Sequence, residues 1–260
     1  MRVINQRIDR LCPFTGKTCI KRLYRTRLPP SGSCSVSHDG EKVIICPNRF
    51  LAENKKLLFM AAASILSSTD VVLVPEITLP EKFGRVDWVA VDRRGERIIN
   101  FAPIETHANQ TTSTGGLTDA IGEHEATGSL SKDRYEFGLN TYHQIKTFFM
   151  QCLMKSQLFK IWDRKFIWIL DHTVFESWKE RFPLASYRFK KKDPIFFFSI
   201  DLVLDQGKGM FILEIKDKIS TNRDELLKAY SRPPGGLPSE TEFISNISRK
   251  MNSGHIFRQI

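Results

Sequence analysis

The fold is decided by the stretch 86–107, which reads VDWVAVDRRGERIINFAPIETH. Its two ends, 86–92 and 97–107, are rich in β-branched, aromatic and apolar residues, which is typical of β-strands. The intervening Arg93-Arg94-Gly95-Glu96 predicts the turn that joins them. We therefore expect an antiparallel hairpin that brings its polar residues near one another at one end of the sheet.

Further strands and helices are expected on both sides of this hairpin. A helix is predicted over about 49–68 and a strand over 70–78, and Asp39-Gly40 predicts a hairpin turn that leads into a strand at 42–46. Residues 108–131 are rich in Thr, Gly and Ser and are expected to form a long loop. The remaining expectations, in chain order, are a helix at 138–158, a strand at 165–171, a helix at 173–181, strands at 195–204 and 210–216, and helices at 222–230 and 239–251. Together these predict an α/β fold with a mixed sheet flanked by helices.

The charge balance predicts a polyanionic partner. The chain has 39 Lys and Arg against 29 Asp and Glu, a formal net charge of +10, and nucleic acid is the commonest partner of such proteins. We find no apolar run long enough to span a membrane and no apolar segment after Met1 that would predict a signal peptide. We therefore expect a cytoplasmic protein whose cysteines stay reduced.

Four of the five cysteines lie close together near the N-terminus, at Cys12, Cys19, Cys34 and Cys46. The segment around them is rich in Pro and Gly and too short for a hydrophobic core of its own, so it needs a cross-link, such as a bound metal ion, to hold its shape. Four thiolates can enclose one Zn²⁺ or Fe ion and leave no open position for chemistry. We expect a structural metal unit over residues 1–50, whereas Cys152, in an apolar helical run, is expected to be a core thiol.

The carboxylates of the strands predict a second kind of metal site. Cleavage of a phosphodiester with Mg²⁺ needs oxygen ligands, and an Asp on one strand with Glu-x-Lys on the next converges on one ion. This PD-(D/E)xK arrangement is offered twice. The first copy has Asp87, Glu105 and His107; the second has Asp201, Glu214 and Lys216. Pattern alone favours the second copy, because it keeps the lysine and its turn sets Asp201 opposite Glu214.

Longer motifs resemble those of the NotI restriction endonuclease family. They are Cys12-Pro13-Phe14, Cys19-Ile20-Lys21, Gly32-Ser33-Cys34-Ser35-Val36, Cys46-Pro47-Asn48-Arg49, Phe83-Gly84-Arg85-Val86-Asp87-Trp88 and Ile104-Glu105-Thr106-His107, with further similarity at Tyr142-His143-Gln144, Ser177-Trp178 and Leu213-Glu214-Ile215. The resemblance covers roughly Cys12 to Met251. It implies a PD-(D/E)xK nuclease core, expected here over residues 51–260, behind the four-cysteine unit.

The resemblance selects the first copy. It implies that Asp87 and Glu105 are the Mg²⁺ ligands and that Glu76 is a further acidic residue near the site. The family has Gln where this chain has His107, and this departure leaves the role of the third position open. The resemblance also implies a structural iron in the cysteine cage. The second copy becomes a supporting hairpin, because the family does not keep its Asp or Lys.

The expected function is that of a type II restriction endonuclease that cuts both strands of a DNA palindrome as a homodimer. Relatives that cut GC-rich sites make such a site the first expectation. Candidate DNA contacts are Arg25 and Arg27 between the cysteines and Asn109 and Gln110 after the catalytic strand. The alternative is a DNA-binding regulator that binds through its cysteine unit and basic surface without cutting.

Overall fold

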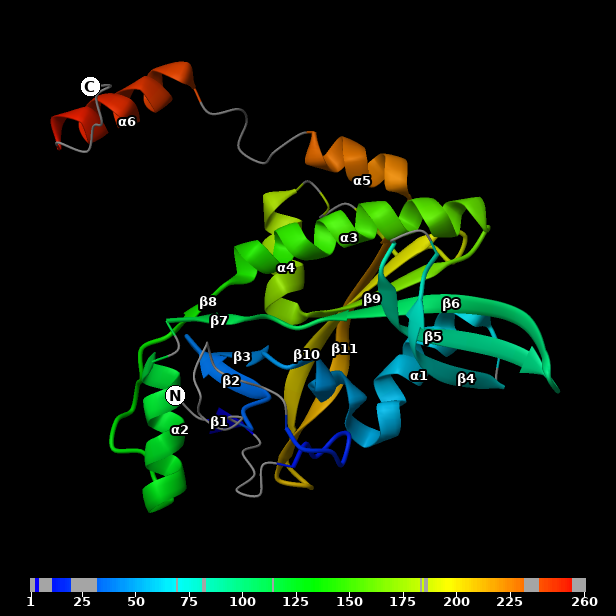
Figure 1. Ribbon diagram of the computed structural model, residues 1–260, viewed down its shortest axis with the longest axis horizontal. Helices are drawn as coiled ribbons and strands as arrows, with labels where there is room; N and C mark the ends of the chain where they lie inside the picture. The colour runs from blue at the N-terminus through cyan, green and yellow to red at the C-terminus, as the bar shows by residue number, and fades with distance from the viewer. Residues whose placement is uncertain are drawn as a thin grey trace.

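The computed structural model has a six-stranded mixed sheet at its centre (Figure 1). In spatial order its strands are β11 (Met210–Thr221), β10 (Ile195–Asp205), β9 (Phe166–Asp171), β6 (Arg97–His107), β5 (Arg85–Arg94) and β4 (Val71–Thr78). The structure describes residues 3–4, 11–19, 32–68, 70–80, 83–113, 115–182, 184, 187–231 and 239–253. The predicted mixed α/β sheet is confirmed.

The pairing directions follow from the connections between strands. The chain runs β4, β5 and β6 as an antiparallel meander, and β10 and β11 form a second antiparallel hairpin. Strand β9 is parallel to both β6 and β10. Parallel neighbours need a crossover, and the helices α3 (Thr141–Ile161) and α4 (His172–Arg181) supply these two crossovers. The two hairpins thus lie at opposite edges of the sheet with β9 between them.

Helices cover the two faces of the sheet unequally. On one face α3, α4 and α5 (Arg223–Tyr230) enclose an aromatic core in which Phe148 lies 5.4 Å from Trp168 and 5.1 Å from Trp178, between ring centroids. The opposite face is covered by α1 (Ala52–Leu66), whose Leu58, Ala61 and Ile65 are buried against the sheet. In the described residues, no helix has both the length and the apolarity that crossing a bilayer requires.

A small three-stranded sheet lies near the N-terminus and is separate from the large one. It consists of β1 (Val3–Ile4), β2 (Ser35–His38) and β3 (Glu41–Ile44). Asp39 and Gly40 both have positive φ, 47° and 87°, as a tight hairpin turn of the favoured handedness requires. The predicted turn is confirmed, and β3 ends at Ile44, before Cys46.

The expected long loop at 108–131 is wrong. The structure has β7 (Thr111–Thr112), paired with β8 (Gly138–Leu139), and a helix α2 (Gly115–Thr127). Leu117 and Ile121 of this helix pack against Val36, Val43 and Ile45 of the N-terminal hairpin. Tertiary burial of these side chains offsets the low helix propensity of the surrounding Gly and Thr residues.

The other boundaries differ mainly at element ends. The expected helix 49–68 is divided into the 3-10 turn η1 (Pro47–Leu51) and α1, and Glu53, Asn54 and Lys55 have positive φ between 53° and 65°. Strand β11 continues to Thr221, beyond the expected end at 216. The last helix, α6 (Glu240–Asn252), begins where expected: Ser239 Oγ accepts a hydrogen bond of 3.1 Å from the Glu242 N–H.

Candidate active site

The two carboxylates of the first copy lie across from each other on β5 and β6. The ladder pairs Val89 with Pro103 and Trp88 with Ile104, and the next position of the same register sets Asp87 opposite Glu105. Residues directly opposite each other in a ladder point to the same face, and Glu105 contacts Lys155 of α3, so both carboxylates are on the side covered by α3 (Thr141–Ile161). The Asp87 carboxylate accepts hydrogen bonds from Thr106, from its N–H at 2.9 Å and from its hydroxyl at 2.7 Å. These bonds fix the orientation of Asp87.

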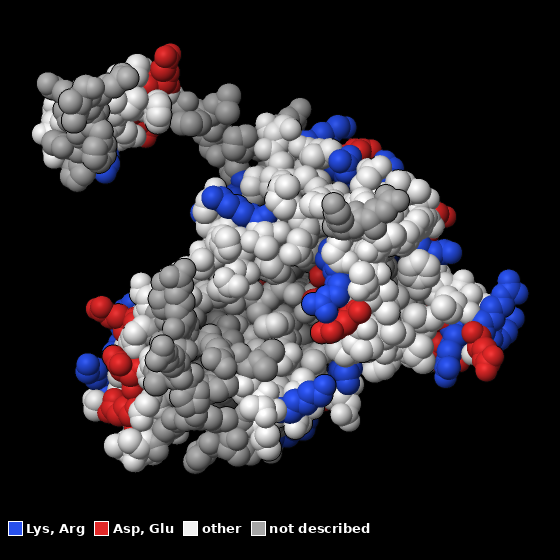
Figure 2. Space-filling view, in the orientation of Figure 1, with Lys and Arg blue, Asp and Glu red and all other residues white. Residues whose placement is uncertain are grey.

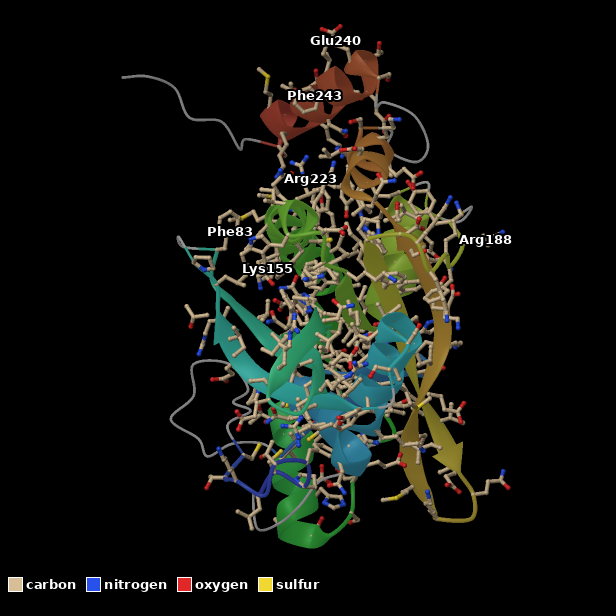
Figure 3. All side chains as sticks on the ribbon, turned by 90° about the vertical axis from the view of Figure 1, so that its right-hand side faces the viewer. Phe83, Lys155, Arg188, Arg223, Glu240 and Phe243 are labelled. Carbon is tan, nitrogen blue, oxygen red and sulfur yellow. The ribbon has the colours of Figure 1, made fainter. Side chains whose placement is uncertain are left out.

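Glu105 is buried and forms an ion pair with Lys155 of α3. The Lys155 ammonium also donates a 2.6 Å hydrogen bond to the carbonyl oxygen of Arg85, and Figure 3 shows this side chain between α3 and the sheet. Burial and repulsion by the Asp87 carboxylate raise the pKa of Glu105 to about 7, and Lys155 opposes this rise. Lys155 therefore favours the ionised form of Glu105, which is the form that binds a cation.

Sequence reasoning missed Lys155. It is on neither β5 nor β6 and lies 50 residues from Glu105 along the chain. A signal was present, because Phe148, Cys152, Lys155 and Phe159 follow one another at helical spacing. All four are buried, and a lysine among apolar residues on the buried face of a helix needs a charged partner.

His107 follows Glu105 by two residues and therefore lies on the same face of β6. Its ring lies 6.0 Å from the Phe148 ring, between centroids. Burial lowers the pKa of His107 to about 4, against the smaller opposing effects of Gln144 and Asp87. The imidazole is thus neutral near pH 7, and its Nε2 atom is buried with no hydrogen-bond partner among the described residues.

A groove of about 820 Å³ opens beside Asp87 and joins three parts of the chain. Its lining residues are Phe14, Thr15, Lys17 and Thr18 near the first cysteines, Pro47, Asn48, Leu51 and Lys55 at the start of α1, and Pro75, Glu76, Asp87, Trp88 and Thr106 of the sheet. The Lys55 ammonium lies over the Trp88 ring, 5.7 Å from its centroid. The groove therefore sets the basic side chains of Lys17 and Lys55 next to β5 and β6.

Glu76 belongs to the rim of this groove rather than to the buried pair. Its side chain is 73% exposed and lies 3.4 Å from the Arg85 guanidinium. Its φ of 52° is left-handed, a conformation that is uncommon for residues other than glycine. Glu76 is thus near Asp87, with its carboxylate turned to solvent.

The positive charge of the chain is not gathered into one broad patch on the face that Figure 2 shows. Blue and red side chains are interspersed over the described part of that face. Arg25 and Arg27 lie outside the described residues. Overall charge therefore marks no single binding surface on this face.

The four N-terminal cysteines share one buried region. Cys12, Cys19, Cys34 and Cys46 are each no more than 6% exposed. The pKa of Cys34 is raised by a hydrogen bond with Cys46, by burial and by repulsion from the other three thiols. The described residues contain no group of three or more His, Cys, Asp or Glu side chains arranged to hold a metal ion. The thiols thus converge, but without the closed geometry of a metal cage.

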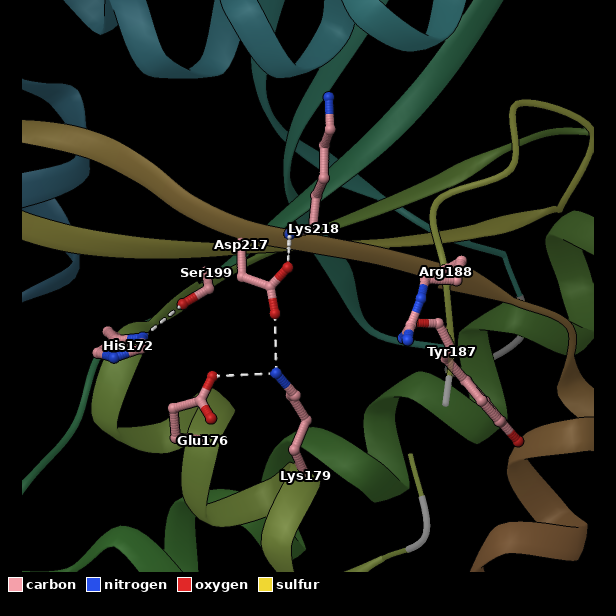
Figure 4. Close-up of polar contacts among 8 residues, drawn as sticks. All are labelled: His172, Glu176, Lys179, Tyr187, Arg188, Ser199, Asp217 and Lys218. Carbon is pink, nitrogen blue, oxygen red and sulfur yellow. Dashed lines mark hydrogen bonds and ion pairs between the residues drawn. The ribbon is translucent and has the colours of Figure 1, made fainter. Parts of the chain in front are cut away.

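The second copy of the pattern has the predicted register but compensated charges. Asp201 pairs with Glu214 across β10 and β11, and Lys216 lies 2.8 Å from the Asp201 carboxylate. Neighbouring polar side chains are paired with one another as well. Lys179 forms ion pairs with Asp217 at 2.8 Å and with Glu176 at 3.2 Å, and His172 Nδ1 lies 2.9 Å from Ser199 Oγ (Figure 4).

The two polar residues just past β6, Asn109 and Gln110, differ in their surroundings. Asn109 is fully buried, and its amide donates hydrogen bonds of 2.9 Å to the hydroxyls of Thr141 and Thr173. Gln110 is exposed. Of this pair, only Gln110 presents its side chain to a partner in solution.

Comparison with known proteins gives one family. The family model described as restriction endonuclease NotI matches residues 1–213, which include the four N-terminal cysteines, the groove, β5 and β6. A search of curated proteins gives no match.

Proposed function

This chain belongs to the NotI restriction endonuclease family, and from this membership we propose that it is a type II enzyme that cuts both strands of DNA with Mg²⁺. Members of the family are site-specific deoxyribonucleases that act on double-stranded DNA. The observation that carries the proposal is the pair Asp87 and Glu105, set opposite each other on neighbouring strands beside the groove. In the second hairpin Asp201 likewise pairs with a lysine, Lys216, so the ion pairs do not separate the two copies; the family match does, because it covers Asp87 and Glu105 and ends at residue 213, before Glu214 and Lys216.

Asp87 and Glu105 would hold Mg²⁺, since both are carboxylates and their mutual repulsion is relieved by a cation. When bound, the ion would stabilise charge on the scissile phosphate and make a water molecule more acidic. Thr106 orients Asp87 through two hydrogen bonds. Lys155 favours the ionised form of Glu105 and supplies the positive charge that the Glu-x-Lys pattern places on the strand.

His107 would act in its neutral form. Its buried Nε2 atom lacks a partner among the described residues and suits a water molecule that is to be oriented or deprotonated. A neutral imidazole and the Gln of the family share the ability to hydrogen-bond without carrying a charge. We therefore propose a positioning role for His107 and leave the positive charge to Lys155.

The cysteine unit would hold a structural Fe or Zn ion. Support comes from the burial of all four thiols and from their effect on the pKa of Cys34, although the described thiols do not form a closed metal-binding group. Their donor chemistry suits either ion. The same unit lines the groove through Phe14, Lys17 and Thr18, so a metal there would fix the wall along which DNA lies.

Recognition would use a homodimer on a palindrome, GC-rich by analogy with relatives, with each subunit cutting one strand. Arg25, Arg27 and Gln110 remain candidates for DNA contacts, and Glu76 is proposed to hold water at the rim of the groove. We do not include Asn109 as a base contact, because it is fully buried.

The test is digestion of plasmid and phage DNA with the purified chain, with Mg²⁺ and without divalent cations. We expect discrete fragments only with Mg²⁺, and sequencing of their ends should give one palindromic site with symmetric cuts on the two strands. The alternative, a regulator that binds DNA without cutting, predicts shifted but intact DNA under both conditions. That result would contradict the proposal.

A further inference from the structure

Helix α6 has an apolar face that nothing in the described chain covers. Phe243, Ile244, Ile247 and Met251 are between 43% and 65% exposed, and no residue of the helix is buried. They recur at spacings of three and four, so they form one stripe along the helix. Figure 1 shows α6 set apart from the helices that cover the sheet, and Figure 3 shows Phe243 and Glu240 on it, away from the sheet.

Such a helix needs a partner to be stable. An isolated helix of 13 residues is marginal in water, and most helical stability comes from packing of the apolar face. The family match ends at residue 213, so α6 lies outside the part of the chain that the family model describes. Its partner is therefore to be found from its own chemistry.

The charges of α6 are arranged to complement a second copy of the same helix. Its first turn carries Glu240 and Glu242, and its last turn carries Arg249 and Lys250. Two copies that run antiparallel set the acidic end of each against the basic end of the other. A two-fold axis that crosses the apolar face at the level of residue 245 sets Phe243 against Ile247 of the second copy and Glu240 against its Lys250, because each of these pairs is symmetric about position 245; the Ser245 side chain itself is on the other side of the helix.

We propose that α6 is a self-association element, which pairs antiparallel with α6 of a second copy of this chain through the stripe Phe243, Ile244, Ile247 and Met251. The pairing is isologous, as a two-fold dimer requires. It deepens the proposed homodimeric assembly by naming the surface. One pair of short helices is a small interface, so we expect affinity in the micromolar range rather than tighter.

The experiment is sedimentation velocity of the full chain over about 1 to 100 µM, without DNA or Mg²⁺. The parent chain should show a reversible monomer–dimer equilibrium. Ile247→Glu should weaken it by about tenfold or more, since a charge enters an apolar contact. Ser245→Glu, on the opposite side of the same helix, is the matched control and should leave the equilibrium unchanged.

A charge exchange tests the antiparallel direction. Lys250→Glu should weaken the dimer because it opposes Glu240, and adding Glu240→Lys should restore it. Three results would each overturn the proposal. The parent chain could stay monomeric throughout, or Ile247→Glu could leave the dimer intact. Ile247→Glu could also only destabilise a monomer, which is the result if α6 packs on its own chain. Because association is measured without DNA, a failure of the nuclease proposal does not affect this outcome, nor does this outcome decide that proposal.

Discussion

Replacing Lys155 with methionine removes the buried ammonium while it keeps a long apolar side chain. Two unit charges about 4 Å apart interact by about 4 kcal/mol at the effective dielectric of protein sites, which corresponds to about three pH units in the ionisation of Glu105. The pKa of Glu105 is already raised to about 7 with Lys155 present. In Lys155→Met the carboxyl should therefore remain protonated at neutral pH and bind a cation poorly.

This change has a defined pH dependence. A carboxyl whose pKa is higher in the folded than in the unfolded state binds its proton more tightly when folded, so stability falls as pH rises from the unfolded pKa to the folded one. For the parent this window runs from about 4 to about 7. In Lys155→Met it should extend to more alkaline pH, and cleavage should be largely lost at pH 7 and partly recovered at higher pH.

The assays are urea unfolding without Mg²⁺ and single-turnover plasmid cleavage at saturating Mg²⁺, both as a function of pH. Lys160→Met is the matched control, because Lys160 is on the same helix but more than half exposed, 3.5 Å from Asp224, and exposed pairs contribute little. If folded Lys155→Met cuts at the parent rate at pH 7 with an unchanged pH profile, Lys155 has no part in the site.

Three further predictions concern neighbouring groups. Because burial lowers the pKa of His107 to about 4, His107→Gln should keep cutting with the parent pH profile between about pH 5 and 8. His107→Ala should cut roughly 10²-fold more slowly. If His107→Ala cuts at the parent rate, His107 has no part in the mechanism. The isolated chain should carry about one Fe or Zn ion, measured by elemental analysis; Cys34→Ser should release it and Cys152→Ser should not, and a metal-free active preparation would contradict this. Burial raises the pKa of Asp171 to about 6, so its contribution to stability is largest below about pH 4 and is lost as pH rises to about 6. Asp171→Asn should therefore make the free energy of unfolding vary less with pH across this window. An unchanged slope would count against a buried titrating Asp171.

The hairpin of β5 and β6 could be predicted because local signals agree there. Two runs of strand-forming residues flank a glycine turn, and β6 has the predicted bounds, Arg97–His107. Helix α2 could not be predicted, because Gly115 and Gly116 favour a loop locally and the helix is stabilised by burial of Leu117 and Ile121 against a distant hairpin.

The candidate site was predictable only where its residues lie on the two strands of one hairpin. The strand pattern offered Asp87 with Glu105 and also Asp201 with Glu214, and favoured the second pair; the family resemblance selected the first pair, whose register places the two carboxylates opposite each other. Lys155 escaped prediction because its partner lies on another element, and its position depends on how α3 packs on the sheet. For Asn109, a polar side chain next to the site predicted a DNA contact, whereas the structure uses its amide within the core.

The central claim is that DNA is cut at Asp87 and Glu105 and not at the second hairpin. Asp87→Asn and Asp201→Asn make the same change at corresponding positions of the two copies, and Asn retains the size of the side chain. With Mg²⁺, Asp87→Asn should lose cleavage by about 10³-fold or more while it still shifts the DNA fragment that contains the site, and Asp201→Asn should cut like the parent. Loss of cutting by a folded Asp201→Asn, with Asp87→Asn active, would contradict the account.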